Sequence, residues 1–237
     1  MVDFHTHILP GIDDGSPNVK TSVEMLKMLK AQGIDRVVAA PHFYMTRDNT
    51  MDFFARRSEA INALINETKG MNDIPKVAVG AEVLLFPELS GIADLEKFCI
   101  QGTNYMLIEM PFGKWSNFTY ETLGRVRATG IIPIIAHFER YIKIQKDKGM
   151  IFRLLDTGCM LQANASFFNN RMTRRKAMGL LREEIIHFVG SDCHDMKNRK
   201  PDIGEAYERI ERKYGHYCME NLEYITEMVL RDAEYCI

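Results

Sequence analysis

The sequence has little of what marks a secreted, membrane-spanning or nucleic-acid-binding protein. Its five cysteines form no C-x-x-C pair and follow no signal peptide, so we expect reduced thiols in a cytoplasmic protein. The longest apolar runs, such as residues 131–136, fall far short of the roughly 20 residues that a membrane span needs. The 30 basic and 32 acidic residues nearly balance and form no long block, which predicts neither direct membrane insertion nor binding to nucleic acid.

No Pro- or Gly-rich linker divides the chain, and no low-complexity segment interrupts it. With 237 residues, of which 46% are hydrophobic, the chain can bury a substantial core and is about as long as one α/β barrel. We therefore expect residues 1–237 to form a single domain.

Short apolar segments alternate with helical patterns along the chain. The segments typical of buried parallel strands are residues 2–5, 36–41, 76–81, 105–109, 131–136, 160–164 and 187–190. Helical patterns cover residues 51–69, 118–129, 147–157, 172–184, 203–214 and 218–233, and a first helix should begin at an N-cap on Ser16 and stop at Gly33. Such alternation predicts a parallel α/β architecture, and seven units favour a (β/α)7 TIM-like barrel over an open sheet.

Acidic and imidazole side chains recur where these apolar segments end. The set is His5, His7, Asp14, His42, Glu82, Glu109, His137, Asp192 and His194, and it includes five of the seven histidines. In H-T-H (5–7) and S-D-C-H (191–194), alternate residues of an extended segment face the same side, which suits two ligands of one metal ion. In a parallel barrel these positions fall at the carboxyl ends of the strands, where barrel enzymes keep their active sites.

Each of these residues taken alone is more easily explained as a hydrogen-bonded residue than as a ligand. Taken together they predict a multinuclear metal site, because burying so many ionisable groups without metal ions would be costly. Imidazole nitrogen and carboxylate oxygen suit Mn, Fe, Zn, Co or Mg in a hydrolytic role and do not discriminate among them. His187 and His216 fall outside the set, and we expect no metal role for them.

The motifs H-T-H, P-H, G-A-E, I-E, A-H-F-E-R and S-D-C-H occur in this order and resemble those of the polymerase and histidinol phosphatase (PHP) superfamily. The opening H-T-H-I-L-P-G-I-D-D-G, with S-D-C-H-D-M-K-N-R, is similar to the bacterial protein-tyrosine phosphatases of the CpsB, CapC and YwqE type. The similarity covers nearly the whole chain. It implies a distorted seven-stranded (β/α) barrel, the PHP fold, that carries three divalent metal ions.

By this resemblance the nine residues divide among the three ions. His5, His7 and Asp192 would hold one ion, Glu82 would bridge it to a second ion held by Glu109 and His137, and Asp14, His42 and His194 would hold the third. Arg140 and Arg199 match the arginines that bind phosphate. Many superfamily members use a histidine where this chain has Asp14, and the adjacent Asp13 is an alternative ligand.

The resemblance also implies an activity. It is that of a protein-tyrosine phosphatase in which a metal-bridging hydroxide attacks the phosphate. The natural target would be the C-terminal tail of a membrane-associated bacterial tyrosine kinase that controls capsular or exopolysaccharide synthesis. Three divalent ions and two arginines, set against four carboxylates and one hydroxide, would leave a charge of about +3 to attract a phosphate dianion.

Other functions stay open on the sequence alone. Within the superfamily the main alternative is a phosphatase for histidinol phosphate or another small metabolite, whereas near-neutral charge disfavours a phosphodiesterase acting on nucleic acid. A non-catalytic module would use the metals structurally and leave no open coordination position. Cys193 and Arg199 have the C-x5-R spacing of cysteine-dependent phosphatases, but the five residues between them contain no glycine and include Asp195, which disfavours a thiolate.

Overall fold

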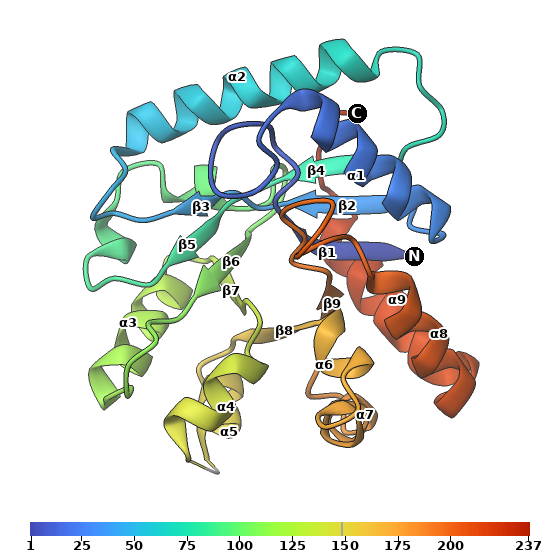
Figure 1. Ribbon diagram of the computed structural model, residues 1–237. Coiled ribbons are helices and arrows are strands. Elements are labelled where there is room, and N and C mark those ends of the chain that lie inside the picture. The colour runs from blue at the N-terminus through green and yellow to red at the C-terminus, as the bar shows by residue number, and fades with distance from the viewer. Residues whose placement is uncertain (148) are drawn as a thin grey trace.

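The computed structural model describes residues 1–147 and 149–237 (Figure 1). The strands are β1 Val2–Thr6, β2 Arg36–Ala39, β3 His42–Phe43, β4 Lys76–Val79, β5 Glu82–Leu84, β6 Tyr105–Glu109, β7 Ile132–Ile135, β8 Met160–Asn164 and β9 Phe188–Gly190. The α-helices are α1 Val19–Ala31, α2 Thr50–Thr68, α3 Asn117–Ala128, α4 Glu139–Gln145, α5 Met150–Asp156, α6 Ala165–Asn169, α7 Arg174–Arg182, α8 Ile203–Tyr214 and α9 His216–Leu230. Two 3-10 helices, η1 Leu89–Gly91 and η2 Leu95–Phe98, lie between β5 and β6.

The strands form a curled parallel sheet with helices along its outer side (Figure 1). The hydrogen-bonded order is β1-β2-β4 in one part and β3-β5-β6-β7-β8-β9 in the other. Two predicted strands, residues 36–41 and 76–81, are each shorter than predicted and are followed by a second short strand, β3 or β5. Pro41, which has no amide hydrogen, lies between β2 and β3, and Gly80 lies between β4 and β5. The seven predicted strand positions are thus all present, and the α/β barrel prediction is confirmed.

Backbone hydrogen bonds join the two ends of the curled sheet. Asp192 N donates to His5 O at 2.8 Å, and His7 N donates to Cys193 O at 2.9 Å. Thr6 and Cys193 form an isolated parallel bridge. We call this junction between β1 and the segment after β9 the seam. It brings residues from the two ends of the sequence side by side at the carboxyl ends of the strands.

A register shift in β1 fixes which side chains enter the barrel. The pairing of β1 with β2 is irregular between Asp3 and Thr6, as at a β-bulge. Phe4 packs in the inner apolar cluster, its ring stacked at 3.9 Å on that of Phe188, and the next residue, His5, also faces the interior. Because the bulge turns two consecutive side chains inward, the apolar floor of the barrel lies directly below the polar residues at its mouth.

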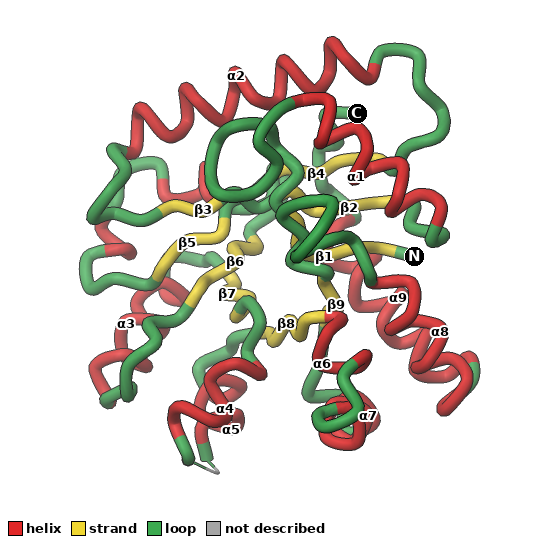
Figure 2. The backbone as a smooth tube through the Cα atoms, in the orientation of Figure 1, coloured by secondary structure: helices red, strands yellow, loops and turns green. Residues whose placement is uncertain are grey.

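The first helix starts later than predicted, so the N-cap at Ser16 is wrong. Asn18 caps α1 instead, since its side chain accepts a hydrogen bond from Thr21 N at 3.0 Å. Ser16 belongs to the loop that coils over the strand ends before α1 (Figure 2), where its hydroxyl donates to Asn18 O. An asparagine directly after a Ser-Pro pair can cap equally well, and the tertiary position of the loop decides between them.

Two short helices, α4 and α6, are absent from the sequence prediction because seven and five residues are too few to show a helical period. The predicted helix over residues 147–157 includes residue 148, which lies outside the described residues, and the helix observed there is α5. Within residues 1–147 and 149–237, no helix has the length and apolar character needed to cross a membrane.

We expect Gly190→Ala to destabilise the fold at the seam. A Cβ atom at Gly190 would lie 2.6 Å from His5 Cβ and 2.9 Å from Gln162 Nε2, so β9 could not keep its distance from β1. Such overpacking costs about 2 kcal/mol of unfolding free energy, which lowers the melting temperature by about 4–8 °C in a chain of this length. Thermal denaturation of the purified variant measures the change.

The matched control is Gly179→Ala. Gly179 lies within α7, where a Cβ would meet no atom within 4 Å, so the substitution should leave the melting temperature unchanged or raise it. Equal melting temperatures for Gly190→Ala and the wild-type chain would contradict the packing described for the seam.

Candidate metal centre

The nine predicted residues converge at the carboxyl ends of the strands. Three groups of potential ligands form there, with the ligand atoms of each group within 4.8 Å of one another: His7, His42 and His194; His5, His7 and Asp192; and His42, Glu82 and Glu109. His137 joins them through Glu82, and Asp14 through His42 and His194. The structure therefore brings together the complete set, from seven separate parts of the chain.

Hydrogen bonds outside the centre fix the tautomers of three histidines. His7 Nδ1 lies 2.8 Å from Asp13 Oδ2, and His194 Nδ1 lies 3.0 Å from the backbone oxygen of Asp192. Because a carboxylate and a carbonyl only accept, both Nδ1 atoms must donate. His5 Nδ1 likewise lies 3.1 Å from Gln162 Oε1. In the neutral form of these imidazoles the Nε2 atoms consequently carry lone pairs, and those lone pairs face one another in the centre.

The lone pairs supply a test of whether cations fit this space. His5 Nε2 and His7 Nε2 are only 3.1 Å apart, although neither neutral ring has a proton to share there. His194 Nε2 is buried and has no hydrogen-bond partner among the described residues. Two facing lone pairs repel, and a buried nitrogen without a partner is costly, unless a proton or a cation lies between them. The donor set therefore fits divalent metal ions.

In the absence of cations, the same space attracts protons. Burial opposes the charged form of His7, but the charge of Asp13 and hydrogen bonds to Asp192 and Glu82 outweigh it and raise the pKa of His7 well above its usual value. Metal ions bind the deprotonated ring, so they compete with these protons and benefit from the same carboxylates.

Glu82 occupies the middle of the centre. Its carboxylate is fully buried and lies 2.7 Å from His137 Nε2, 3.2 Å from His5 Nε2 and 3.0 Å from His42 Nδ1. Its Oε1 faces His137 and its Oε2 faces the other two rings. One carboxylate with an oxygen directed to each side has the geometry of a bridge between two cations.

The two adjacent acids of the first loop have different surroundings. Asp13 is mostly buried and turns away from the centre, where it accepts from His7 Nδ1, His42 N and Gly15 N. Asp14 is 68% exposed, and its Oδ1 lies 3.5 Å from His42 Nε2 and 3.7 Å from His194 Nε2. Asp14 thus faces the ligand side of these rings, whereas Asp13 orients a ring from behind.

Sequence reasoning missed a pair of amides on β8 that supports the centre from below. Gln162 Oε1 accepts hydrogen bonds from His5 Nδ1 and, at 2.8 Å, from His137 N. Gln162 Nε2 donates to Asn164 Oδ1, and Asn164 Nδ2 donates to Asp192 Oδ2, each at 3.0 Å. Two buried amides spaced by two residues on an otherwise apolar strand were the available signal.

Tyrosine hydroxyls complete the support. Tyr44 OH lies 3.1 Å from both His42 Nδ1 and Glu109 Oε2, and Tyr141 OH lies 3.4 Å from His137 Nδ1. His137 and Asp192 also hold the backbone at φ values of 34° and 55°, a left-handed conformation that costs a non-glycine residue free energy. The surrounding contacts hold these two residues in a conformation that aims their side chains at the centre.

Arg140 and Arg199 approach the rim of the centre. Both form ion pairs with Asp192, Arg199 at 2.7 Å, and their side chains keep 35% and 39% exposure. They therefore present charged groups both to a ligand residue and to the solvent at the mouth. Of the histidines outside the set, His187 accepts from Leu161 N on β8, and His216 begins α9.

Cys193 has no access to a substrate. Its side chain is fully buried below the seam, and burial, followed by the charge of Asp3, raises the pKa of its thiol well above the usual value. A buried neutral thiol is a poor nucleophile, so the structure disfavours the cysteine-dependent alternative.

Comparison with known proteins identifies the family and the fold. The family model described as capsular polysaccharide synthesis, CpsB/CapC, matches residues 1–230. A putative tyrosine-protein phosphatase CapC from Staphylococcus aureus is 29% identical over 235 residues, which cover 95% of this chain and 88% of the relative.

Solved structures agree with this match. A chain from the crystal structures of YwqE from Bacillus subtilis and CpsB from Streptococcus pneumoniae, described as metal-dependent tyrosine phosphatases, has a TM-score of 0.86 and 27% identity and covers 99% of this chain and 96% of its own length. A histidinol phosphate phosphatase from Lactococcus lactis shares the fold, with a TM-score of 0.53, 15% identity and coverage of 91% and 94%. With its family model matched almost from end to end, this chain belongs to the CpsB/CapC family.

Proposed function

We propose that this chain is a metal-dependent protein-tyrosine phosphatase, formed by residues 1–237 as a single domain. The observation that carries the proposal is the cluster of nine ligand-type residues with two arginines at its rim, in a member of a family whose relatives are tyrosine-protein phosphatases. We further propose that three divalent ions bind this cluster.

In this proposal His5, His7 and Asp192 would hold one ion, Glu82 would bridge to a second ion held by Glu109 and His137, and Asp14, His42 and His194 would hold the third. The two-sided contacts of Glu82 support the bridging role. His42 lies between groups, with Nδ1 toward Glu82 and Nε2 toward Asp14, so its assignment to the third ion depends on the Nε2 side. Oxygen and nitrogen ligands of this kind suit Mn, Fe, Zn, Co or Mg.

Bound divalent ions polarise phosphoryl oxygens and lower the pKa of water, which supplies a nucleophile at neutral pH. The residues of the chain would position the ester. Arg140 and Arg199 would turn from Asp192 to the phosphoryl oxygens, where a guanidinium donates two parallel hydrogen bonds. Asn164 would keep its hydrogen bond to Asp192 and hold that carboxylate in place. Positioning and positive charge are the main requirements of phosphoryl transfer.

The leaving group explains why a tyrosine ester fits this centre. A phenolate, with a pKa of about 10, leaves far more easily than a serine alkoxide and needs less help from a general acid, so a centre that acts mainly through positive charge favours phosphotyrosine. The proposed substrate is a phosphotyrosine protein, and the resemblance described above suggests the tail of a bacterial tyrosine kinase, with the link to polysaccharide synthesis supported by the family description. A cytoplasmic location belongs to the same proposal and accords with five free cysteines.

Metal removal and cysteine removal should have opposite effects. We expect a chelator to abolish hydrolysis of a phosphotyrosine peptide, and His7→Ala, Glu109→Ala or Asp192→Ala to lower kcat/KM by at least about 100-fold. Cys193→Ser should keep most of the activity of the wild-type chain. Steady-state kinetics with elemental analysis of each protein measures this, and inactivation by thiol alkylation with resistance to chelators would support the cysteine mechanism instead.

Substrate preference should follow the leaving group. The wild-type chain should hydrolyse phosphotyrosine peptides with a kcat/KM at least about 100-fold higher than matched phosphoserine peptides, because the phenolate needs less help to leave. Histidinol phosphate is the third substrate to compare. Equal rates for the two peptides would contradict the tyrosine proposal, and a large preference for histidinol phosphate would favour a metabolite phosphatase.

Asp13→Asn should weaken metal binding without removing a ligand. The amide accepts from His7 Nδ1 less strongly than the carboxylate, so the ring loses basicity and orientation, an effect that typically costs about 10- to 100-fold in metal affinity. Activity should therefore recover as the metal concentration is raised, which a metal titration measures. Asp73→Asn, at an exposed ion pair with Lys27, is the control and should behave as the wild-type chain does.

A further inference from the structure

A trough leads away from the candidate metal centre across the surface of the barrel. It consists of three adjoining cavities. The first, of about 280 Å³, lies at the rim between Asp192, Arg199 and Arg140. The second, of about 300 Å³, shares Arg140, Asn164 and Ser166 with the first.

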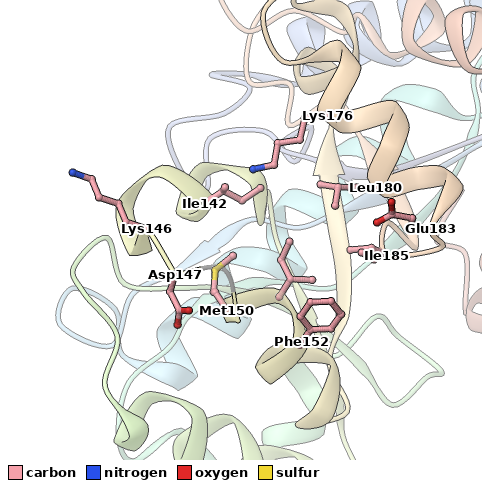
Figure 3. Close-up of a pocket in the computed structure, with 10 residues that line it drawn as sticks. Ile142, Lys146, Asp147, Met150, Phe152, Lys176, Leu180, Glu183 and Ile185 are labelled. Carbon is pink, nitrogen blue, oxygen red and sulfur yellow. The ribbon is translucent and has the colours of Figure 1, made fainter.

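The third cavity, of about 450 Å³, shares Ile142 and Lys176 with the second. Figure 3 shows it between α4 and α5 on one side and α7 with the following loop on the other. The three cavities together thus run from the mouth of the barrel outward along the gap between these helices. We call this surface the trough.

The middle of the trough is positively charged. Lys143 on α4 and Lys176 on α7 are exposed, and neither forms an ion pair with any of the described residues. The carboxylate that lines the same cavity belongs to Glu139, and its Oε1 accepts a hydrogen bond from Asn164 N while its Oε2 is buried. Arg140 is paired with Asp192, so two lysines without an ion pair among the described residues face the cavity against one carboxylate turned inward, and the middle of the trough attracts anions.

The far end of the trough is lined by six apolar residues and by four charged ones, Lys146, Asp147, Lys176 and Glu183. Met150, Phe152, Leu180 and Ile185 line it together with Ile142 (Figure 3). Phe152 is 62% exposed although it is a large aromatic side chain within a helix. A cavity of this size falls within the range of about 300–1,000 Å³ typical of ligand sites. Its apolar residues suit an apolar side chain, and the two lysines and two carboxylates of its lining balance each other in charge.

The geometry points to a binding site for the peptide segment that flanks phosphotyrosine, an inference that rests on the proposed function. The segment would place carboxylate side chains against Lys143 and Lys176 and an apolar side chain, farther from the phosphotyrosine, beside Phe152. Continuity with the arginine-lined rim places such a segment in line with the phosphate, and the unpaired lysines define its charge. The trough would therefore select acidic phosphotyrosine peptides that end in an apolar anchor.

The charged part of the trough is tested with a double variant, Lys143→Glu with Lys176→Glu. The measurement is the ratio of the KM for an acidic phosphotyrosine peptide to the KM for p-nitrophenyl phosphate, which is too small to reach the lysines. We expect this ratio to rise by about 5- to 10-fold, as reversal of two exposed charges allows. Replacing the peptide's Glu residues by Gln should remove most of the difference between the variant and the wild-type chain.

Lys69→Glu is the matched control, because Lys69 follows α2 at the opposite end of the barrel and is equally exposed. It makes the same charge change and should leave the ratio unaltered. A ratio that stays the same in the double variant, or rises equally in Lys69→Glu, would overturn the inference.

The apolar end is tested with Phe152→Ser. Wild-type protein should prefer a peptide with a leucine beyond its acidic residues over the same peptide with serine at that position, and the variant should lose about threefold or more of this preference. An unchanged preference would remove the apolar anchor from the inference. Since Phe152 is exposed, the substitution leaves the core of the fold intact.

A binding measurement separates failure of this inference from failure of the proposed function. Fluorescence anisotropy with a peptide that carries a non-hydrolysable phosphonate in place of phosphotyrosine gives the Kd of each variant without turnover. Absence of hydrolysis of both substrates by metal-loaded wild-type protein would reject the proposed function, while a higher Kd only in the trough variants would still support the trough. Equal Kd values in all variants would reject the trough whatever the activity.

Discussion

The convergence of buried imidazole nitrogens on one another at the mouth of the barrel is the constraint on which the rest of this molecule depends. Lone pairs 3.1 Å apart repel each other, and neutral rings remain in that arrangement only if their other nitrogen is held from outside and positive charge lies between them. Asp13, Gln162 and the backbone oxygen of Asp192 provide the outer contacts. The sheet, its bulge and its loops serve to bring these partners to the correct sides of each ring.

Much of this could be predicted from the sequence because the ligands follow apolar segments. Parallel strands deliver their carboxyl ends to one side of a barrel, so the position of His42 or Glu109 in the sequence already fixes its place in space. The strands themselves were also predictable, because a short continuous apolar run between two helical patterns is typical of a buried parallel strand. The breaks after Ala39 and Val79 depend on local backbone pairing, and no periodicity reveals them.

The supporting residues were harder to predict because their roles arise from tertiary geometry. Nothing in the sequence distinguishes the buried Asp13, which holds a ring, from the exposed Asp14 beside it. Gln162 supports His5 and His137, which lie 157 and 25 residues away, and only the closed barrel makes these three neighbours. The bulge in β1 is similarly invisible, although it turns Phe4 and His5 to the same interior. Sequence patterns therefore identified the ligand residues but missed the residues that orient them.

The seam joins residues that are synthesised at the beginning and near the end of translation. His5 and His7 leave the ribosome first, but Asp192 and His194 join them only after almost the whole chain has been made and β9 has docked against β1. A nascent or truncated chain that lacks Asp192 and His194 therefore leaves two of the three ligand groups incomplete. Docking of β9 against β1 is thus the folding step that completes these two groups.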